Sequence, residues 1–365
     1  MPRGTRCAPA HSPQTLPCAQ RFRLRGIPRR SNGLGGGVDV GERSTRGRTL
    51  ADVSEELLLD EIFPLLAGGP GVLVGPGDDT AVVETPDGSV IATTDAMVRG
   101  RDWRDEWSTG RDVGAKVVAQ NLADVAAMGG RPTGVLVTLV ADPTTSVQWV
   151  LDLARGIGAA ARAAGATVLG GDLSSAPSGT LVVSVTALGS LDGRAPVLRS
   201  GAQPGDVVAV AGTLGLAAAG WRLLEAGLAD ADPEAVALQR CPRPPLAQGP
   251  AAADAGATAM LDLSDGLLRD AARIARSSSV RLDLNSAQLA PDVARLEPAL
   301  GSALAGECVL AGGEEHSLLA CFPPRAGLPP GWRVVGAVHE GEGVTVDDGP
   351  EPVRGWDHFA AGGTD

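Results

Sequence analysis

The sequence predicts an α/β fold, layered in the α+β sense, that is divided into two domains. Strand-like apolar runs alternate with helical patterns, as in "GVLVTLV", "SVQWVLDLARGIGAAARAAG" and "ATVLG". The chain has 365 residues, of which 44% are hydrophobic, so it is long enough for two cores. A polar, turn-rich link near residues 190–200 precedes a second strand, glycine turn and helix. We therefore expect one domain over residues 51–195 and another over 196–365.

The first 50 residues differ in composition from the rest of the chain. They hold ten Arg and two acidic residues, with Pro, Gly and Ser clusters and no sustained hydrophobic period. Such a segment cannot bury enough apolar surface to fold, so we expect residues 1–50 to form a disordered Arg-rich extension. The folded part is expected to begin near Ser54, a candidate N-cap for the helical pattern that follows it.

Composition excludes several classes of protein. A net charge of −12 argues against a general nucleic-acid partner, and no apolar run is long enough to span a membrane. The five cysteines are widely spaced without a CxxC pair, and the four histidines form no close pair. This pattern disfavours a disulfide framework and a zinc site. We expect a cytoplasmic protein.

One helix carries polar side chains on a face that is otherwise apolar. The segment "DVGAKVVAQNLADVAAMGG" is predicted to be a helix capped by Asp112 and ended by Gly129. Asn121 and Asp124 are three residues apart on one face, and the helix is apolar on another face as well, so both should point inward. A buried Asp requires a cation or several hydrogen-bond donors. A polar network without a ligand is the alternative.

Further aspartates follow strand-like apolar runs or glycine turns. The pair Asp78 and Asp79 alone is explained by a solvated glycine turn. The pattern recurs, however, in segments that offer no basic neighbour for these acids, which suggests a shared cluster for hard cations. The recurring positions are Asp95, Asp124, Asp172, Asp262 and Asp265.

Acids, Thr hydroxyls and glycine turns together favour phosphoryl transfer assisted by magnesium. No GxxxxGK[ST] motif occurs, so the chain is not a P-loop enzyme. Ser264 precedes a helix, where it either caps the helix or helps to bind phosphate. Arg199 lies near the domain link and offers a bidentate phosphate contact, although an exposed Arg is the ordinary alternative.

The ordered set of motifs resembles thiamine-monophosphate kinase, over roughly residues 54–360. These motifs are "GPGDDTAVV", "TTDAMV", "GAKVVAQNLADVAAMGGRP", "GGDLSS", "LRSGAQPGDVV", "AMLDLSDGLLRD", "GGEEHSLL" and "GWDHF". The family belongs to the aminoimidazole ribonucleotide synthetase superfamily. The resemblance therefore implies a two-domain fold of that type, an N-terminal domain that forms a homodimer, and ATP bound near the dimer interface.

The resemblance also implies the reaction and its residues. ATP phosphorylates thiamine monophosphate by direct in-line transfer with several magnesium ions, and no catalytic side chain is required because the attacking phosphate is already anionic. The implied magnesium ligands are Asp79, Thr93, Thr94, Asp95, Asp124, Asp172, Asp262 and Asp265. The implied ATP contacts are Gly171, Asp172, Arg199 and Ser264. The implied substrate contacts are Glu314 and Trp356, with Asp102 as a further candidate that could meet the thiazolium by charge.

The chain departs from the family pattern on the acceptor side. Asp102 stands where a His is usual, Glu315 and His316 replace an Asp–Tyr pair, and Trp356 replaces a Tyr. Phosphoryl transfer is therefore better supported than the acceptor. The alternatives are a related ATP-dependent enzyme, such as a selenophosphate synthetase or a hydrogenase-maturation protein, and a non-catalytic cation-binding protein. The first would carry a reactive Cys near the start of its folded domain and the second a C-terminal Cys, and neither is found here.

Overall fold

The computed structural model describes residues 47–66, 69, 71–74, 82–325 and 327–356. The expected Arg-rich extension lies outside this range except for residues 47–50, and so do Asp78 and Asp79. Contacts divide the chain between residues 44 and 45, so every described element belongs to one unit. Within these described ranges, no helix is both long and apolar enough to cross a membrane.

The packed chain begins a few residues before Ser54. Arg48 already forms an ion pair with Glu61 at 3.2 Å. Ser54 caps helix α1 (Glu55–Ile62) as predicted, because its hydroxyl accepts a hydrogen bond from the Leu57 N–H at 3.3 Å.

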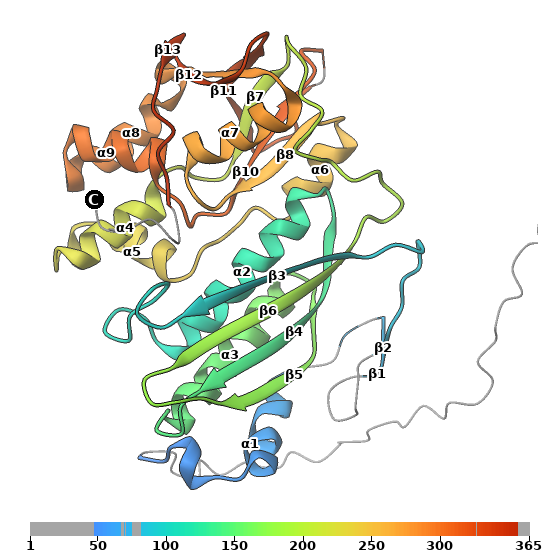
Figure 1. The fold of residues 1–365 in the computed structure, drawn as a ribbon, viewed down its shortest axis with the longest axis vertical. Helices are drawn as coiled ribbons and strands as arrows, with labels where there is room; N and C mark the ends of the chain where they lie inside the picture. The colour runs from blue at the N-terminus through green and yellow to red at the C-terminus, as the bar shows by residue number, and fades with distance from the viewer. Residues whose placement is uncertain (1–46, 67–68, 70, 75–81, 326, 357–365) are drawn as a thin grey trace, which may run out of the picture. The chain divides into compact units, whose positions relative to one another are not determined.

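A four-stranded sheet with two helices on one face forms the first half of the structure (Figure 1). Its strand order is β3-β6-β4-β5, with β3 and β4 antiparallel to β6, and β5 parallel to β4. Helix α3 provides the crossover that a parallel pair needs. The elements are β1 (Val72–Val74) and β2 (Val82–Val83), which pair separately, then β3 (Ile91–Val98), α2 (Gly110–Ala127), β4 (Arg131–Ala141), α3 (Val147–Ala163), β5 (Thr167–Ser175) and β6 (Leu181–Ser190).

The two faces of this sheet have different surroundings. On β3, Thr93 and Asp95 are half-buried on the side of α2, whereas Thr94 and Ala96 are exposed on the other side. In Figure 1, α2 and α3 lie behind the sheet, and no described helix covers its front face. Strand β3 therefore presents alternate side chains to helix α2 and to an open face.

Helix α2 begins earlier than the sequence predicted. Thr109, not Asp112, is its N-cap, because the Thr109 hydroxyl accepts a hydrogen bond from the Asp112 N–H at 3.3 Å. The Asp112 carboxylate in turn accepts from the Thr109 N–H at 2.9 Å, which completes a capping box. The helix is buried on most of its surface, as its apolar residues on two faces predicted.

Glycines allow α2 and α3 to cross closely. A Cβ added to Gly114 of α2 would lie 2.3 Å from the Leu153 carbonyl oxygen, and one added to Gly156 of α3 would lie 2.2 Å from the Arg111 carbonyl oxygen. Both obstacles are backbone atoms, which cannot rotate away. The crossing therefore has no room for a side chain at either position.

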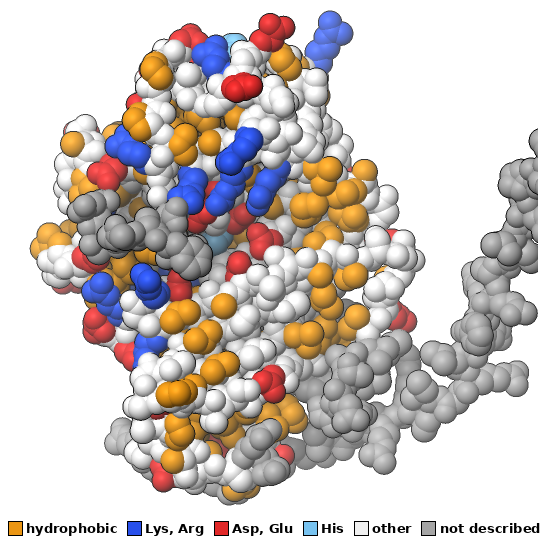
Figure 2. Space-filling view, viewed as in Figure 1, with side chains coloured by type: hydrophobic (Ala, Val, Ile, Leu, Met, Phe, Trp, Pro, Cys, Tyr) orange, Lys and Arg blue, Asp and Glu red, His pale blue; other side chains and the backbone are white. Residues whose placement is uncertain are grey.

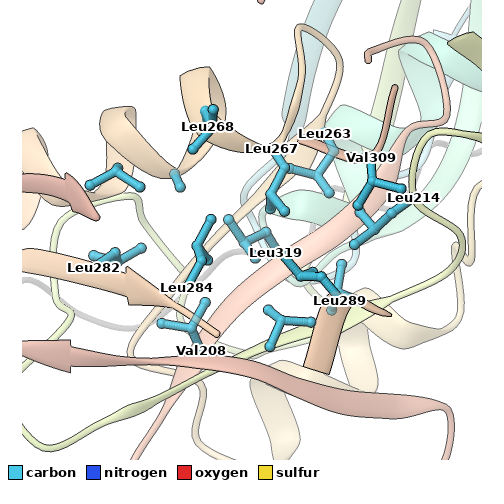
Figure 3. Close-up of a cluster of buried hydrophobic side chains, with 14 of the residues drawn as sticks. Val208, Leu214, Leu263, Leu267, Leu268, Leu282, Leu284, Leu289, Val309 and Leu319 are labelled. Atoms are coloured by element: carbon cyan, nitrogen blue, oxygen red, sulfur yellow. The ribbon is translucent and has the colours of Figure 1, made fainter. Parts of the chain in front are cut away.

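A seven-stranded sheet of order β13-β12-β9-β11-β7-β10-β8 forms the second half. Figure 3 shows part of its core, where Leu267 lies beside Leu263 and Leu319, and Val208 lies near Leu284. The predicted α/β class is confirmed. The elements are β7 (Val207–Ala211), α4 (Leu216–Glu225), α5 (Pro233–Arg240), α6 (Gln248–Asp254), β8 (Ala259–Leu263), α7 (Leu267–Ser278), β9 (Arg281–Leu284), α8 (Ser286–Leu300), α9 (Ser302–Ala311), β10 (Ser317–Phe322), β11 (Trp332–His339), β12 (Gly343–Val346) and β13 (Gly349–Pro350).

The C-terminal end of α2 packs on the second half. Ala126 and Ala127 share a buried cluster with Met260 of β8 and Phe322 of β10. A Cβ on Gly249 of α6 would lie 2.0 Å from the Ala126 carbonyl oxygen. Helix α2 thus contacts both sheets, and its side chains reach the region where the two halves meet.

We expect Gly114→Ala to lower the free energy of unfolding by about 1–3 kcal/mol, because the added methyl group meets a backbone carbonyl. The matched control is Gly306→Ala in α9, where an added Cβ meets nothing within 4 Å. There, the higher helix propensity of Ala should raise stability by about 0.5–1 kcal/mol. Urea unfolding of both variants measures the difference, and equal effects would contradict a tight crossing.

Candidate active site

A cavity of about 1040 Å³ opens where β3, α2, α4, β8, α9 and the segment near residue 355 come together. It is lined by most of the predicted site residues, namely Thr93, Asp95, Asp124, Arg199, Asp262, Ser264, Asp265, Asp102, Glu314 and Trp356. Basic side chains line it as well, and Figure 2 shows blue side chains gathered beside red ones midway along the visible face. The cavity thus joins acidic, basic and aromatic side chains from both halves.

Helix α2 and strand β3 hold the acidic part of the cavity in place. The Asp124 carboxylate accepts a hydrogen bond from the Thr93 hydroxyl at 2.7 Å. Asn121, fully buried, accepts from the Asp95 N–H at 2.9 Å and donates to the Val117 carbonyl at 2.8 Å. The prediction that Asn121 and Asp124 point inward is therefore confirmed.

Asp124 is held in a position that disfavours its charge. Burial raises its pKa to about 6, and the nearby charges of Asp262 and Asp95 add to this effect, while the hydrogen bond from Thr93 opposes it. A cation beside these carboxylates would relieve the repulsion. Among the described residues, however, no three His, Cys, Asp or Glu side chains stand close enough to hold a metal ion by themselves.

Asp262 has a partner that its own segment did not reveal. Its carboxylate lies 3.0 Å from Nδ1 of His316, which is also buried. Burial opposes the charged imidazolium, but the hydrogen bond and the charge of Asp262 outweigh it and raise the pKa of His316. His316 stands where the family pattern has Tyr, and it touches the acidic part of the cavity.

The turn after β8 is shaped by a buried carboxylate. Asp270 accepts hydrogen bonds from the N–H groups of Asp265 and Gly266, at 3.0 and 3.1 Å. Arg273 forms ion pairs with both Asp265 and Asp270. Burial raises the pKa of Asp270 to about 7, with Arg273 opposing it. The N-cap of α7 is Gly266 and has no side-chain cap, so the expected capping role of Ser264 is wrong.

Glu315 occupies the N-terminus of α4. Its carboxylate accepts hydrogen bonds from the N–H groups of Gly215 at 2.8 Å, Ala217 at 3.1 Å and Leu216. These contacts satisfy backbone donors that otherwise have no partner at a helix start. The glycine turn before α4 therefore binds a side chain of this chain and is not open to a phosphate.

The three predicted substrate contacts, Asp102, Glu314 and Trp356, all line the cavity. The Asp102 carboxylate accepts from the Val98 N–H at 2.6 Å, which closes the turn after β3. Glu314 pairs with Lys116 at 3.0 Å. The Trp356 N–H donates to the Asp265 carbonyl at 3.0 Å, so its backbone is tied to the turn after β8.

Sequence reasoning missed several lining residues, among them Trp221 of α4. The guanidinium of Arg104 lies 4.4 Å from the ring centre of Trp107 and 5.8 Å from that of Trp221, and the two rings meet edge-on at 5.0 Å. Trp221 faces the cavity beside Arg222. No motif marks these positions, because the cluster joins the turn after β3 to a helix of the second half.

Three predicted residues lie away from the cavity lining. Thr94 points to the open face of β3, where its hydroxyl donates to the Val185 carbonyl at 3.0 Å. Gly171 and Asp172 lie on β5, at the far edge of the sheet, and Asp172 is exposed with a hydrogen bond from Ser174. A Cβ on Gly171 would lie 1.9 Å from the Val137 carbonyl oxygen, so the glycine is explained by close strand packing.

Comparison with known proteins defines the family. The AIR synthase related protein family matches twice, through its N-terminal domain at residues 77–191 and its C-terminal domain at residues 203–349. The chain is 43% identical to a thiamine-monophosphate kinase of Mycobacterium tuberculosis over 321 residues, which are 87% of this chain and 95% of that protein. The chain belongs to the thiamine-monophosphate kinase family.

Solved structures agree with this family. The thiamine-monophosphate kinase of Stenotrophomonas maltophilia K279a has a TM-score of 0.71 and 31% identity, covering 82% of this chain and 98% of that chain. A structure described as AaThiL complexed with AMPPCP and TMP has a TM-score of 0.68 and 31% identity, covering 77% of this chain and 91% of that chain. The predicted aminoimidazole ribonucleotide synthetase-like fold is thereby confirmed for a member of the thiamine-monophosphate kinase family.

We expect Asp124→Asn to stabilise the metal-free protein above pH 6. The folded-state pKa of Asp124 is raised, so its contribution to stability is present at low pH and is lost as the pH rises through about 6. The variant lacks this loss. The free energy of unfolding of the variant, relative to that of the wild type, should therefore increase by about 1–3 kcal/mol from pH 4 to pH 7. Urea unfolding with a chelator measures it, and a constant difference would contradict the electrostatic account.

Proposed function

We propose that this protein transfers the γ-phosphate of ATP to thiamine monophosphate, which yields thiamine diphosphate and ADP. The observation that carries the proposal is one cavity whose acidic part holds Asp95, Asp124 and Asp262 and whose other part holds Glu314 and Trp356. The structural relative complexed with AMPPCP and TMP supports both substrates. A purely cation-binding protein would account for the acids but not for the arginines and the aromatic wall.

Magnesium is the proposed metal, and its proposed ligands at this cavity are Thr93, Asp95, Asp124, Asp262 and Asp265. All offer oxygen donors, and the repulsion that raises the pKa of Asp124 suits a divalent cation. Magnesium usually keeps water and phosphate oxygens as ligands, so a cage of three acids is not required. When bound, it would neutralise charge on the phosphates. Asp79, Thr94 and Asp172 remain predicted ligands.

The side chains of the protein would bind and orient the phosphates. Arg199 and Arg273 line the cavity and offer guanidinium groups for phosphate oxygens, and Ser264 offers a hydroxyl. Gly171 remains a predicted ATP contact on β5. The attacking oxygen belongs to a phosphate that is already anionic, so positioning takes the place of a general base. This division of labour needs no catalytic side chain.

A homodimer through the first half is also proposed. The open face of the four-stranded sheet exposes Val98 and Leu136, and Figure 2 shows hydrophobic side chains spread over this region. An uncovered sheet face with apolar residues is typical of an interface.

We further propose domains over residues 51–195 and 196–365. We also propose a cytoplasmic location, which suits the free thiols of Cys241, Cys308 and Cys321.

Mass-spectrometric product analysis tests the proposed reaction. The purified protein is incubated with ATP, magnesium and a panel of phosphate acceptors that includes thiamine monophosphate and selenide. Thiamine diphosphate and ADP in equal amounts are the expected products. ADP formation with another acceptor, or metal binding without turnover, would point instead to a related enzyme or to a cation-binding protein.

We expect Trp356→Ala to raise the KM for thiamine monophosphate by about tenfold and to leave the KM for ATP within about twofold. An indole stacked on a cationic ring contributes on the order of 1–2 kcal/mol when desolvated, and 1.4 kcal/mol is a factor of ten. The backbone bond from Trp356 to Asp265 survives the change. Trp356→Phe, which keeps a flat ring, is the matched variant and should lie closer to wild type.

Steady-state kinetics with each substrate varied in turn, beside a melting curve, separates binding from packing. Equal effects of Trp356→Ala on both substrates would assign the side chain to packing alone.

A further inference from the structure

Lys116 is the only lysine among the 31 Lys and Arg residues of the chain. It lies on α2, and its side chain is 3% exposed. Its ammonium contacts the Glu314 carboxylate at 3.0 Å and 3.1 Å and the Asp102 carbonyl oxygen at 3.2 Å. One buried cation from the first half thus touches two residues that line the acceptor part of the cavity.

Glu314 is poised between this cation and the cavity. Its side chain is 36% exposed, so the carboxylate faces the cavity on one side and Lys116 on the other. Gln239 also donates to this carboxylate, at 3.3 Å. The backbone of Glu314 has a φ of 69°, an unfavourable region for a residue with a side chain, and its N–H donates to the Ser264 carbonyl at 2.9 Å. These contacts together therefore fix the position of the Glu314 carboxylate.

The identity of the residue at position 116 is informative in this chain. Arginine stands at every other position among the Lys and Arg residues, including those in the ion pairs on the surface. A guanidinium is broad and planar, whereas an ammonium is a compact charge on a thin stem. In the site between Asp102 and Glu314, the compact ammonium contacts both residues while the side chain stays buried.

We propose that Lys116 is a positioning residue of the acceptor site, which acts by fixing the Glu314 carboxylate and the Asp102 backbone against the bound acceptor. The inference rests on the proposed kinase activity and deepens it. Lys116 joins α2, which also carries Asp124, to the loop of the second half that carries Glu314. The acceptor contacts are thereby placed relative to the acidic cluster.

A double-mutant cycle with Lys116→Met and Glu314→Gln tests the proposal. Met fills a similar volume without charge, and it leaves Glu314 in contact with solvent, so the protein should fold and melt as wild type does. The KM for thiamine monophosphate should rise by about tenfold, while the KM for ATP stays within about twofold. In the Glu314→Gln background, adding Lys116→Met should raise the acceptor KM by clearly less than in the wild-type background, because the charged partner is already lost and only the contact with the Asp102 carbonyl oxygen remains to be removed.

Thermal stability gives a second test, in which Glu314→Gln should be more harmful than Lys116→Met. Glu314→Gln leaves the buried ammonium of Lys116 without its counter-charge, so this variant should melt below wild type and below the double variant. Should Lys116→Met fail to fold, Lys116→Gln takes its place in the same cycle, with the same expected results.

The single lysine also permits a direct observation. In protein labelled with ¹⁵N-lysine, one side-chain ammonium resonance reports on Lys116 alone. We expect it to shift when thiamine monophosphate is added without ATP, and to shift again in Glu314→Gln. No change with either the acceptor or the substitution would overturn the proposal.

Full additivity of the two substitutions in the acceptor KM, or equal effects on ATP and acceptor, would also overturn it. Wild-type turnover, measured alongside, keeps the two claims separate. A wild-type protein that forms no thiamine diphosphate refutes the proposed function, whereas normal wild-type turnover with an unaffected Lys116→Met variant refutes only the role of Lys116.

Discussion

The burial of helix α2 is the constraint on which the rest of the structure depends. One of its faces packs on α3 through glycine contacts, another faces β3, and its C-terminal end packs on the seven-stranded sheet. A helix enclosed in this way cannot shift without disturbing both halves, because protein interiors are close-packed. The polar side chains Lys116, Asn121 and Asp124 are therefore held in fixed positions, and each has a specific hydrogen-bond partner.

The carboxylates that line the cavity differ in whether they have a charged partner. Asp265 is paired with Arg273 and Asp262 with His316, whereas Asp124 has a neutral hydroxyl partner in Thr93. Burial and the neighbouring charges of Asp262 and Asp95 oppose the charge of Asp124, which accounts for its raised pKa. Such a cavity attracts a cation to its acidic side chains, while Arg199, which also lines it, offers a guanidinium group to an anion.

The sequence predicted the elements and the inward acids well, because helical and strand periodicity are local properties. Asn121 and Asp124 were found from spacing alone, and Ser54 from its place before an apolar helix. The position of Thr94 opposite Thr93 and Asp95 was also implicit in strand alternation, but the family pattern groups all three. The roles of Glu315, Arg273 and Lys116 depend on partners brought near only by the fold: Glu315 and Gly215 are 100 residues apart, and Lys116 and Glu314 are 198 apart. Asp172 lies far from the cavity because β5 is at the opposite edge of the sheet from β3, and this strand order cannot be predicted from any single segment.

The two faces of strand β3 lie in different environments. Thr93 and Asp95 face the cavity, and the intervening Thr94 faces the open side of the sheet. A slip of one residue would exchange the two sets entirely, so the register of β3 against β6 is fixed by both environments at once. A partner that docks on the open face would therefore contact the same strand as a ligand that enters the cavity, but on its opposite face. Thermodynamic linkage makes such an influence mutual: whatever association does to nucleotide affinity, the nucleotide does to association.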